Sequence, residues 1–388
     1  MIYLDNAATS FPKPPRVIEE QTRCMRRYCG NPGRGSHALS RAAAEKIYEC
    51  RGEAAELFGL GKPENVMFTM NTTMALNIVI KGMLQVGDHV LLSDMEHNAV
   101  YRPIYKMARA GLISYDIFPT HARDPDATPE MICAEIERLI KPRTKLLICA
   151  HASNICSATL PLEQIGLLCR AREIFFAVDA AQSAGHIPID MERMQIDALC
   201  VPGHKGLLGP QGCGMLLLAG DRIPDTLMEG GSGVNSLEGS MPEETPERYE
   251  AGTLPTPAIA GLCEGIRAVR RIGVEEIHAR ECELIEQLKA GLLQLPRVRL
   301  YAPHHRGSVL LCNVDGLSSD RVGALLDAEG ICVRTGYHCS ALGHVTLQTP
   351  IGGAVRISAG VFNTPAEIQK ILAVMEKICE KAEKGRLP

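Results

Sequence analysis

A succession of seven short apolar runs, separated by segments with helical periodicity, constrains the fold of this chain more than any other feature. The runs cover residues 66–70, 89–93, 112–118, 145–150, 175–179, 197–201 and 214–219. They are nearly continuous in apolar residues, which is typical of strands buried on both faces. The intervening segments, such as 128–140 and 161–172, carry apolar residues at helical spacing. This alternation predicts an α/β fold with a mostly parallel seven-stranded sheet flanked by helices.

A break in this rhythm predicts two domains. Residues 220–257 are rich in glycine, proline and acidic residues and show no periodicity, which is typical of a connection or a functional segment. A long helical stretch follows over 258–295. Beyond it, a smaller α/β unit is expected, with strands near 298–302, 308–314, 331–334 and 354–358 and helices at 318–329 and 364–383. We therefore predict a large domain at 21–257 and a small domain at 258–388, with residues 1–20 packing against the small domain.

Composition and charge argue against several classes of protein. The chain has 41 basic and 45 acidic side chains, a net charge of −4, so it lacks the basic footprint of a nucleic-acid or membrane-surface protein. No apolar run approaches the roughly 20 residues of a membrane helix, and the first ten residues do not resemble a signal peptide. The 15 cysteines lack C-x-x-C spacing, which favours neither a disulfide framework nor a metal site. We expect a soluble, cytoplasmic protein that binds no metal.

Polar residues follow several of the predicted strands, where open α/β sheets bind their ligands. Thr72 and Thr73 begin a helical segment after the first run. Their hydroxyls and free N–H groups can hold a phosphate, although such residues are also favoured helix caps. Asp179 ends a wholly apolar run, where a carboxylate either needs a cationic partner or caps a helix. Asn154 lies in a polar cluster after the run at 145–150.

Lys205 is the most specific of these strand-end residues. It lies between a histidine and a glycine, shortly after the run at 197–201. In a partly desolvated pocket a lysine can lose its proton and attack a carbonyl. An imine-forming Lys205, an acid at Asp179 and a phosphate cradle at the threonines together suit pyridoxal 5′-phosphate. This cofactor has an aldehyde, a pyridine nitrogen and a phosphate, and it needs one partner for each.

A cysteine and two arginines stand out in the predicted small domain. Cys339 follows His338 among small polar residues, whereas several other cysteines lie inside apolar runs. A thiolate at this position can be favoured by cations such as His338 or Arg334, although a structural role remains equally open. Arg356 lies inside a strand pattern, where a guanidinium commonly grips a carboxylate in bidentate fashion or forms a structural ion pair.

Taken together, these motifs resemble a known family. The segments that carry the resemblance are YLDNAAT, NTTMALN, MEHN, SNICSAT, VDAAQSAGH, GHKGLLGPQG, YEAGT and RTGYHC. They are similar to the motifs of the cysteine desulfurases, which are class-V aminotransferase-like, fold-type I pyridoxal-phosphate enzymes. The resemblance spans essentially the whole chain. The form of the last motif is similar to the branch that includes the selenocysteine lyase-like desulfurases.

The resemblance implies roles for four residues around the cofactor ring. Lys205 would bind the aldehyde covalently, and Asp179 would pair with the pyridinium nitrogen. Gln182 would hydrogen-bond the phenolic oxygen, and His97 would stack over the ring. Lys205 and His97 would also take part in catalysis.

The cofactor phosphate would be bound by Thr73 and His204, beside Thr72. The family resemblance adds Thr253, which would reach this phosphate from the other subunit of a homodimer. The chain departs from the family at Pro202, where a serine or threonine is usual. Because proline has neither a hydroxyl nor an N–H group, we expect one phosphate ligand to be lost.

On the substrate side, the resemblance implies that Asn154 and Arg356 bind the substrate carboxylate and that Cys339 accepts the sulfur. Two positions depart from the family here. Tyr337 stands where the branch often has a histidine, and Ser157 replaces a glycine that often follows the substrate-binding asparagine. Both departures bear on proton transfer and cofactor binding in the expected site.

The leading hypothesis is therefore a pyridoxal-phosphate-dependent cysteine desulfurase. It would convert L-cysteine to L-alanine and transfer the sulfur to Cys339 as a persulfide, for an acceptor protein such as one of iron–sulfur cluster assembly. A second hypothesis is a selenocysteine lyase, for which Cys339 could be dispensable because selenium leaves more readily. A third, prompted by Pro202, is a persulfide carrier that has kept the fold and lost turnover.

Overall fold

The computed structural model describes residues 1–33 and 35–383, and its largest sheet has seven strands in the order β2-β8-β7-β6-β5-β3-β4. The strands are β2 (Val66–Thr69), β3 (His89–Ser93), β4 (Ser114–Phe118), β5 (Thr144–Ala150), β6 (Phe175–Asp179), β7 (Ala198–Pro202) and β8 (Gly214–Leu218). Only β8 runs antiparallel to its neighbours, β2 and β7. The prediction of a mostly parallel seven-stranded sheet is confirmed.

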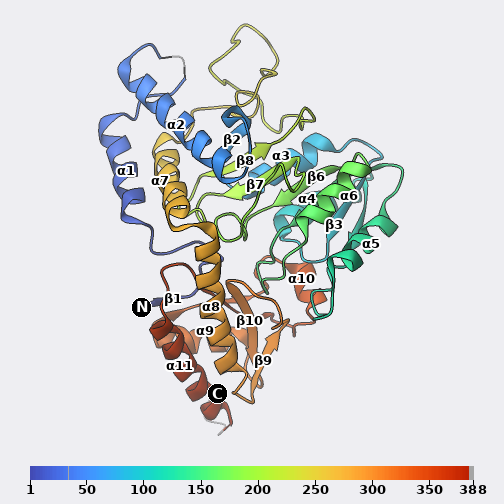
Figure 1. The fold of residues 1–388 in the computed structure, drawn as a ribbon, viewed down its shortest axis with the longest axis vertical. Helices are drawn as coiled ribbons and strands as arrows, with labels where there is room; N and C mark the ends of the chain where they lie inside the picture. Colours follow the sequence, from blue (N-terminus) through green and yellow to red (C-terminus); the bar gives the residue numbers. More distant parts are fainter. Residues whose placement is uncertain (34, 384–388) are drawn as a thin grey trace.

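Helices cover both faces of this sheet because its strands are apolar on both faces (Figure 1). In β6, Phe176 and Val178 pack against one core, and Phe175 and Ala177 pack against the other. The first core is covered by α2 (Ala38–Leu57), α5 (Pro129–Leu139), α6 (Leu162–Ala171) and α7 (Thr256–Ile272). The second is covered by α3 (Thr72–Met83) and α4 (Asn98–Arg109). The buried polar side chains of this sheet, such as Ser93 and Asp179, therefore lie at strand ends.

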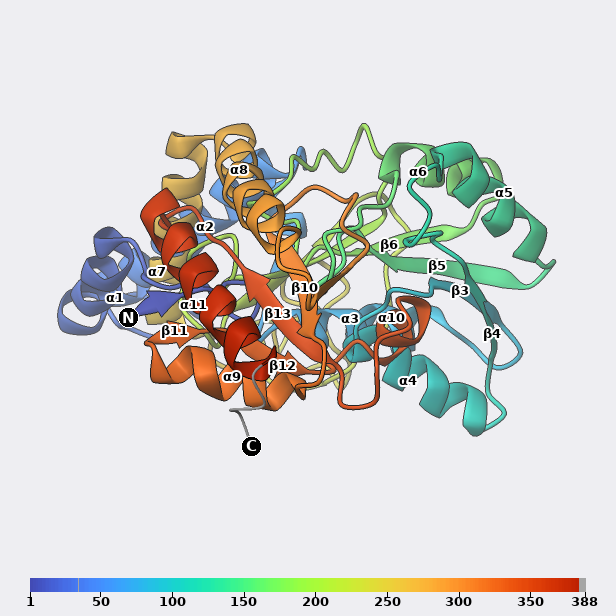
Figure 2. The ribbon, with the colours of Figure 1, turned by 90° about the horizontal axis from the view of Figure 1, so that it is seen from below.

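A smaller antiparallel sheet, in the order β12-β13-β10-β9, lies beneath the large one in Figure 1. Its strands are β9 (Val298–Tyr301), β10 (Val309–Val314), β12 (Arg334–Gly336) and β13 (Ala354–Ser358). Figure 2 shows α8 (Val274–Leu292), α9 (Ser319–Ala328) and α11 (Pro365–Glu383) around this sheet. It also shows the short α10 (Ala341–Thr346) close to α4, where the smaller unit meets the large sheet.

Two predicted elements differ from the structure. The helical stretch expected over 258–295 is two helices, because Gly273 between α7 and α8 has a φ of 95°. That left-handed conformation ends α7 through a hydrogen bond to the Val269 carbonyl. The strand expected at 331–334 is also divided: β11 (Ile331–Cys332) pairs with β1 (Ile2–Tyr3), whereas β12 belongs to the four-stranded sheet.

Beyond β1, the N-terminal segment connects the two units. The Asp5 carboxylate binds Arg356 of β13, at 2.7 Å from Nη2. Farther along, Thr9, Ser10 and Lys13 all donate hydrogen bonds to the carbonyl of His204, at 3.0 Å, 3.1 Å and 2.8 Å. The segment therefore holds the backbone beside Lys205 and also contacts the smaller sheet. In the described residues, no helix has the length and apolar character needed to cross a membrane.

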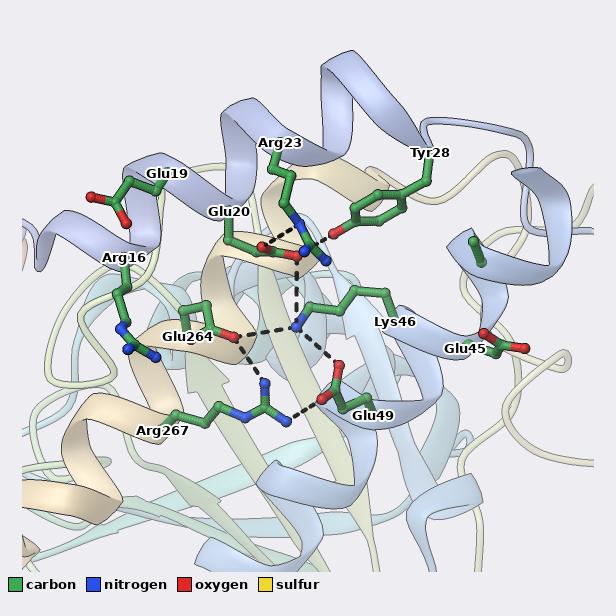
Figure 3. A pocket seen from close by; sticks show the side chains of 11 residues that line it. Arg16, Glu19, Glu20, Arg23, Tyr28, Glu45, Lys46, Glu49, Glu264 and Arg267 are labelled. Atoms are coloured by element: carbon green, nitrogen blue, oxygen red, sulfur yellow. Dashed lines mark hydrogen bonds and ion pairs between the residues drawn. The ribbon is translucent and has the colours of Figure 1, made fainter. Parts of the chain in front are cut away.

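An ion-pair cluster joins α1 (Pro15–Arg27), which follows this segment, to α2 and α7 (Figure 3). The amino group of Lys46, a residue only 9% exposed, lies 2.9 Å from Glu49, 3.3 Å from Glu264 and 3.8 Å from Glu20. Arg267 pairs with Glu264 and Glu49 from the other side. The opposite charges of this cluster pair with one another across the hollow that they line. These ion pairs stabilise the packing of the three helices.

We expect Lys46→Met to lower the free energy of unfolding by about 1–3 kcal/mol, because the partly buried carboxylates of Glu20, Glu49 and Glu264 lose a cationic partner. Urea denaturation followed by far-UV circular dichroism measures this change. The matched control is Lys370→Met, which removes an exposed lysine from helix α11 and should shift the value by less than about 0.5 kcal/mol. An equal effect of the two substitutions would contradict the stabilising role of the cluster.

Candidate active site

The carboxyl ends of β5, β6 and β7 meet at one edge of the large sheet, where the strand register aligns them. Ala150 pairs with Asp179, and Asp179 pairs with Cys200. A cavity opens beyond these ends and beyond the start of α3. Eight of the predicted site residues line it: Thr72, Thr73, His97, Asn154, Asp179, Gln182, His204 and Lys205. The structure therefore brings together residues that are up to 133 positions apart in the sequence (205 − 72).

Lys205 lies in a tight turn after β7 that only glycine neighbours permit. A Cβ atom on Gly206 would come within 2.2 Å of the Ala184 carbonyl, and one on Gly203 within 2.6 Å of the Cys213 carbonyl. Burial lowers the pKa of Lys205 to about 8, and the nearby Asp179 carboxylate only partly offsets this effect. About a tenth of the Lys205 amine is therefore neutral at pH 7 and able to act as a nucleophile, far more than for an exposed lysine.

Asp179 is a buried carboxylate that lines the cavity. It is 3% exposed, and its Oδ1 accepts the Ala181 N–H at 2.9 Å. Burial raises the pKa of Asp179, and the hydrogen bond from Ala181 and the charge of Lys205 oppose this shift. A buried carboxylate is costly without a cationic partner, so a ligand that carries a protonated ring nitrogen would fit this position.

The start of α3 and the loop of His204 supply unsatisfied polar groups. The Asn71 side chain accepts the Met74 N–H at 3.0 Å, while the N–H groups of Thr72 and Thr73 have no partner inside the helix. Thr72 Oγ1 and His204 Nδ1 are buried without a hydrogen-bond partner. Buried polar atoms are normally paired. These atoms fit an anionic group such as a phosphate, bound at the positive end of a helix.

His97 caps α4 and faces the same cavity. Its Nδ1 accepts the Ala99 N–H at 3.0 Å. Burial, and after it the charge of Lys205, lower the pKa of His97 to about 4. The ring is therefore neutral at pH 7, with its proton on Nε2 and available to a ligand. Gln182 also lines the cavity, and its Nε2 donates to the Ala7 carbonyl at 3.0 Å.

Arg356 lies behind Asn154 and does not line the Lys205 cavity. It is 1% exposed, its Nη1 donates to the Asn154 carbonyl at 3.2 Å, and its Nε is buried without a partner. Its β12 neighbour in the sheet register is Arg334. Both arginines lower the pKa of Lys205, after the larger effect of burial. Asp5, which pairs with Arg356, was not predicted as a site residue, although it lies in the YLDNAAT motif.

Cys339 is exposed, on a loop beside the start of α4. The Asn98 N–H donates to the Cys339 carbonyl at 2.7 Å, so the loop lies next to the cap residue His97. The expectation that His338 supplies a positive charge is wrong. Burial, and then the charge of Arg356, lower the pKa of His338 to about 3, so its ring is neutral at pH 7.

The remaining predicted residues have other surroundings. Thr253 lines a different cavity, together with Arg51 and Glu250, and does not meet Lys205 within its own chain. Pro202 lines the Lys205 cavity and offers no donor.

Ser157 has a φ of 59°, which a glycine would adopt freely. Its hydroxyl compensates by donating to the Val309 carbonyl and accepting the Val309 N–H, both at 2.9 Å, which joins this loop to β10.

Comparisons with known proteins identify the family to which the chain is similar. A sequence profile of the family described as aminotransferase class-V matches residues 2–371. A probable cysteine desulfurase of Methanothermobacter thermautotrophicus is 31% identical over 97% of this chain and 94% of its own length. One of Pyrococcus abyssi is 32% identical over the same shares. The apo structure of a cysteine desulfurase from Thermococcus onnurineus NA1 is 32% identical, with a TM-score of 0.88 over 98% of this chain and 94% of that one.

Glu96, which precedes His97, is a functional-site neighbour that the sequence analysis missed. It is fully buried, and its Oε1 accepts hydrogen bonds from the Ser93 hydroxyl and, at 2.9 Å, from the Ala150 N–H. Its Oε2 is buried without a partner. Burial raises the pKa of Glu96 to about 8, so the carboxyl group is largely protonated at neutral pH. The MEHN motif is the only sequence signal that points to this residue.

The raised pKa of Glu96 predicts a pH-dependent stability. The folded protein retains this proton more tightly than the unfolded chain between pH 4.5 and 8, so the free energy of unfolding falls as the pH rises through that window. Glu96→Gln should make the free energy of unfolding less dependent on pH, by about 1.4 kcal/mol per pH unit in this window. Urea denaturation from pH 5.5 to 8 measures it, with exposed Glu192→Gln as the control. Parallel curves for wild type and Glu96→Gln would show that Glu96 is already ionised.

Proposed function

The chain belongs to the class-V aminotransferase family and is similar along its whole length to cysteine desulfurases, and we propose that it converts L-cysteine to L-alanine, with pyridoxal 5′-phosphate bound at Lys205. The observation that carries this proposal is the single cavity that unites a lysine of lowered pKa, a buried carboxylate and unpaired donors at a helix start.

The residues present fit the cofactor. Thr72, Thr73 and His204 would bind the phosphate through the atoms that lack partners, and they would do so without help from Pro202. Asp179 would stabilise a protonated ring nitrogen. The neutral His97 would pack against the ring, and Gln182, which lines the same cavity, would hydrogen-bond the phenolic oxygen. When bound, pyridoxal phosphate supplies an electron sink for the carbanion that forms at the substrate Cα.

Lys205 has two tasks in this proposal. Its amine would hold the cofactor through the aldehyde, because burial lowers the pKa of Lys205 to about 8 and leaves part of the amine unprotonated near neutral pH. Lys205 Nζ would also accept the proton of the substrate Cα and later return one to the product. Both tasks need an amine that exchanges protons near neutral pH.

The substrate carboxylate would bind beside Asn154 and Arg356. Arg356 is already oriented, because Asp5 holds Nη2 and the Asn154 carbonyl holds Nη1. Its Nε–H group is buried without an acceptor, which a carboxylate oxygen would supply. The neighbouring Arg334 adds positive charge on the same side. An α-amino acid would thus be held at one end while its side chain points away from these arginines.

Cys339 would receive the sulfur. Its Sγ attacks the substrate sulfur, the Cβ–S bond of cysteine breaks, and a new S–S bond forms. Cysteine and the Cys339 thiol together become alanine and a Cys339 persulfide, so the transfer itself needs no added oxidant or reductant. Cys339 is exposed, which suits delivery of the persulfide sulfur to an acceptor protein.

A homodimer would complete the site. Thr253 lies on a cavity separate from that of Lys205, which is compatible with a contribution to the phosphate site of the partner subunit. In this proposal the protein acts in the cytoplasm and hands its sulfur to an acceptor such as one of iron–sulfur cluster assembly.

Lys205→Ala should abolish covalent attachment of the cofactor. After incubation with pyridoxal 5′-phosphate and borohydride reduction, peptide mass mapping should find the phosphopyridoxyl group on Lys205 in the wild type. The variant should carry none and should form alanine about a thousandfold or more slowly. Lys370→Ala, at an exposed helix position, is the control. A label on any other lysine of the wild type would sink the proposal.

Cys339→Ser should retain the cofactor and lose sulfur transfer. We expect alanine formation from L-cysteine to fall about a hundredfold or more, since a hydroxyl cannot form the S–S bond. Cys29→Ser, which changes the other exposed cysteine, should behave like the wild type. The measurement is anaerobic alanine release from L-cysteine and L-selenocysteine. Unchanged release from cysteine would refute the role of Cys339.

The same assay separates the alternative functions. A selenocysteine lyase would release alanine from L-selenocysteine in Cys339→Ser as fast as in the wild type, and it would prefer that substrate throughout. A persulfide carrier without turnover would bind no cofactor and release alanine from neither amino acid.

A further inference from the structure

The loop that carries Cys339 has a strained backbone. Between β12 and α10, Gly336, His338 and Cys339 have φ angles of 94°, 51° and 57°. Residues other than glycine adopt this left-handed conformation at a cost, and they keep it where the surrounding structure holds them. Two such residues in succession, one of them the expected sulfur acceptor, therefore call for a specific restraint.

Two hydrogen bonds from the large sheet's loops hold the backbone of this segment. The Asn98 N–H donates to the Cys339 carbonyl at 2.7 Å, and Asn154 Nδ2 donates to the His338 carbonyl at 2.8 Å. These bonds place the loop near the cavity, but both leave the His338 side chain free to turn. Within the segment, the Ser340 N–H donates to the Tyr337 carbonyl at 2.9 Å and closes a turn over His338 and Cys339. The His338 ring is a further anchor of this turn.

The His338 ring is held by a buried chain of hydrogen bonds. Its Nε2 lies 3.3 Å from the Arg334 carbonyl, and its Nδ1 lies 3.1 Å from His344 Nε2. His344 Nδ1 then lies 2.8 Å from the Thr349 hydroxyl. The two rings are nearly parallel, at 15°, with centroids 5.3 Å apart. Both histidines are buried, so water does not compete for these bonds.

Only one arrangement of protons satisfies this chain when both rings are neutral. The Arg334 carbonyl can only accept, so His338 Nε2 carries the proton and Nδ1 must accept. His344 Nε2 therefore donates to His338, and His344 Nδ1 accepts from the Thr349 hydroxyl. Burial lowers the pKa of His338 to about 3 and that of His344 to about 4, which keeps both rings neutral at pH 7.

The ring of Tyr337 braces His344 from the outside. It meets the His344 ring edge-on, with centroids 5.3 Å apart, and its hydroxyl accepts the Gly352 N–H at 3.0 Å. The tyrosine that departs from the family at this position thus has a packing role. His344 itself lies on α10 and does not line the Lys205 cavity.

We propose that His344 is a positioning residue for sulfur transfer, which acts by donating to His338 and so holding Cys339 in its left-handed conformation. The proposal rests on the proposed role of Cys339. His344 touches neither substrate nor cofactor in this view. Its loss should slow the step that needs the thiol in place, and it should leave binding of the substrate carboxylate and of the cofactor intact.

The test compares two substitutions at this position. His344→Leu removes the donor, and we expect kcat for alanine formation to fall about tenfold with KM changed less than about twofold. His344→Gln keeps an N–H donor at a similar reach, so its kcat should stay within about threefold of the wild type. Borohydride labelling of Lys205 should be equal in all three proteins. A loss that merely reflects folding would lower labelling and kcat together.

A second readout does not depend on turnover. Hydrogen–deuterium exchange of the peptide spanning residues 337–349 should be faster in His344→Leu than in the wild type, and unchanged in α3. The proposal would be overturned if His344→Leu had the exchange rate and the kcat of the wild type. It would also be overturned if kcat fell equally in His344→Gln and His344→Leu. If the wild type releases no alanine from cysteine, the proposed function fails, and the exchange data alone decide the positioning.

Thr349→Val provides an independent variant should His344→Leu not fold. It removes the hydroxyl that donates to His344 Nδ1 while keeping the side-chain shape. We expect kcat to fall about threefold and exchange in the 337–349 peptide to rise, with Thr349→Ser restoring both. Wild-type values for Thr349→Val in both measurements would overturn the proposal.

Discussion

Burial of both faces of the seven-stranded sheet is the constraint on which the rest of the structure depends. Its strands are apolar on both faces, and helices cover each face with a separate core. Polar chemistry can then occur only where strands end. The register places Ala150 beside Asp179 and Asp179 beside Cys200, so the loops after β5, β6 and β7 leave the sheet together. Asp179 and Lys205 share one cavity for this reason.

The electrostatics of the site follow from the same burial. Burial holds the imidazoles of His97, His204 and His338 neutral, since it lowers each pKa to between about 3 and 4. The positive charge that remains comes from Lys205, Arg334 and Arg356. The buried donors without partners lie on Thr72, His204 and Arg356. A site with this surplus of donors and positive charge favours a ligand that brings two anionic groups, as a phosphorylated cofactor and an amino acid substrate together do.

The site also depends on contacts between the two sheets. Asp5 orients Arg356, the N-terminal segment holds the His204 carbonyl, and Ser157 joins its loop to Val309 of β10. The Cys339 loop is held by Asn98 and Asn154 from one side and by the His338–His344 pair from the other. Side chains of the candidate site that come from distant segments thus keep their places through contacts with neighbours in another part of the chain.

The amino-acid pattern predicted the large sheet and eight of the residues that line the Lys205 cavity. Continuous apolar runs predicted the seven strands, and the residues just after them predicted Thr72, Thr73, Asp179 and Lys205, because burial leaves polar groups only at strand ends. Four features became visible only in the folded chain. His338 is neutral, and Asp5 binds Arg356. Glu96 is a buried acid, and Thr253 lies on a separate cavity. Charge state and pairing depend on burial and on partners far away in the chain, as the 351 positions between Asp5 and Arg356 illustrate, and no local pattern encodes them.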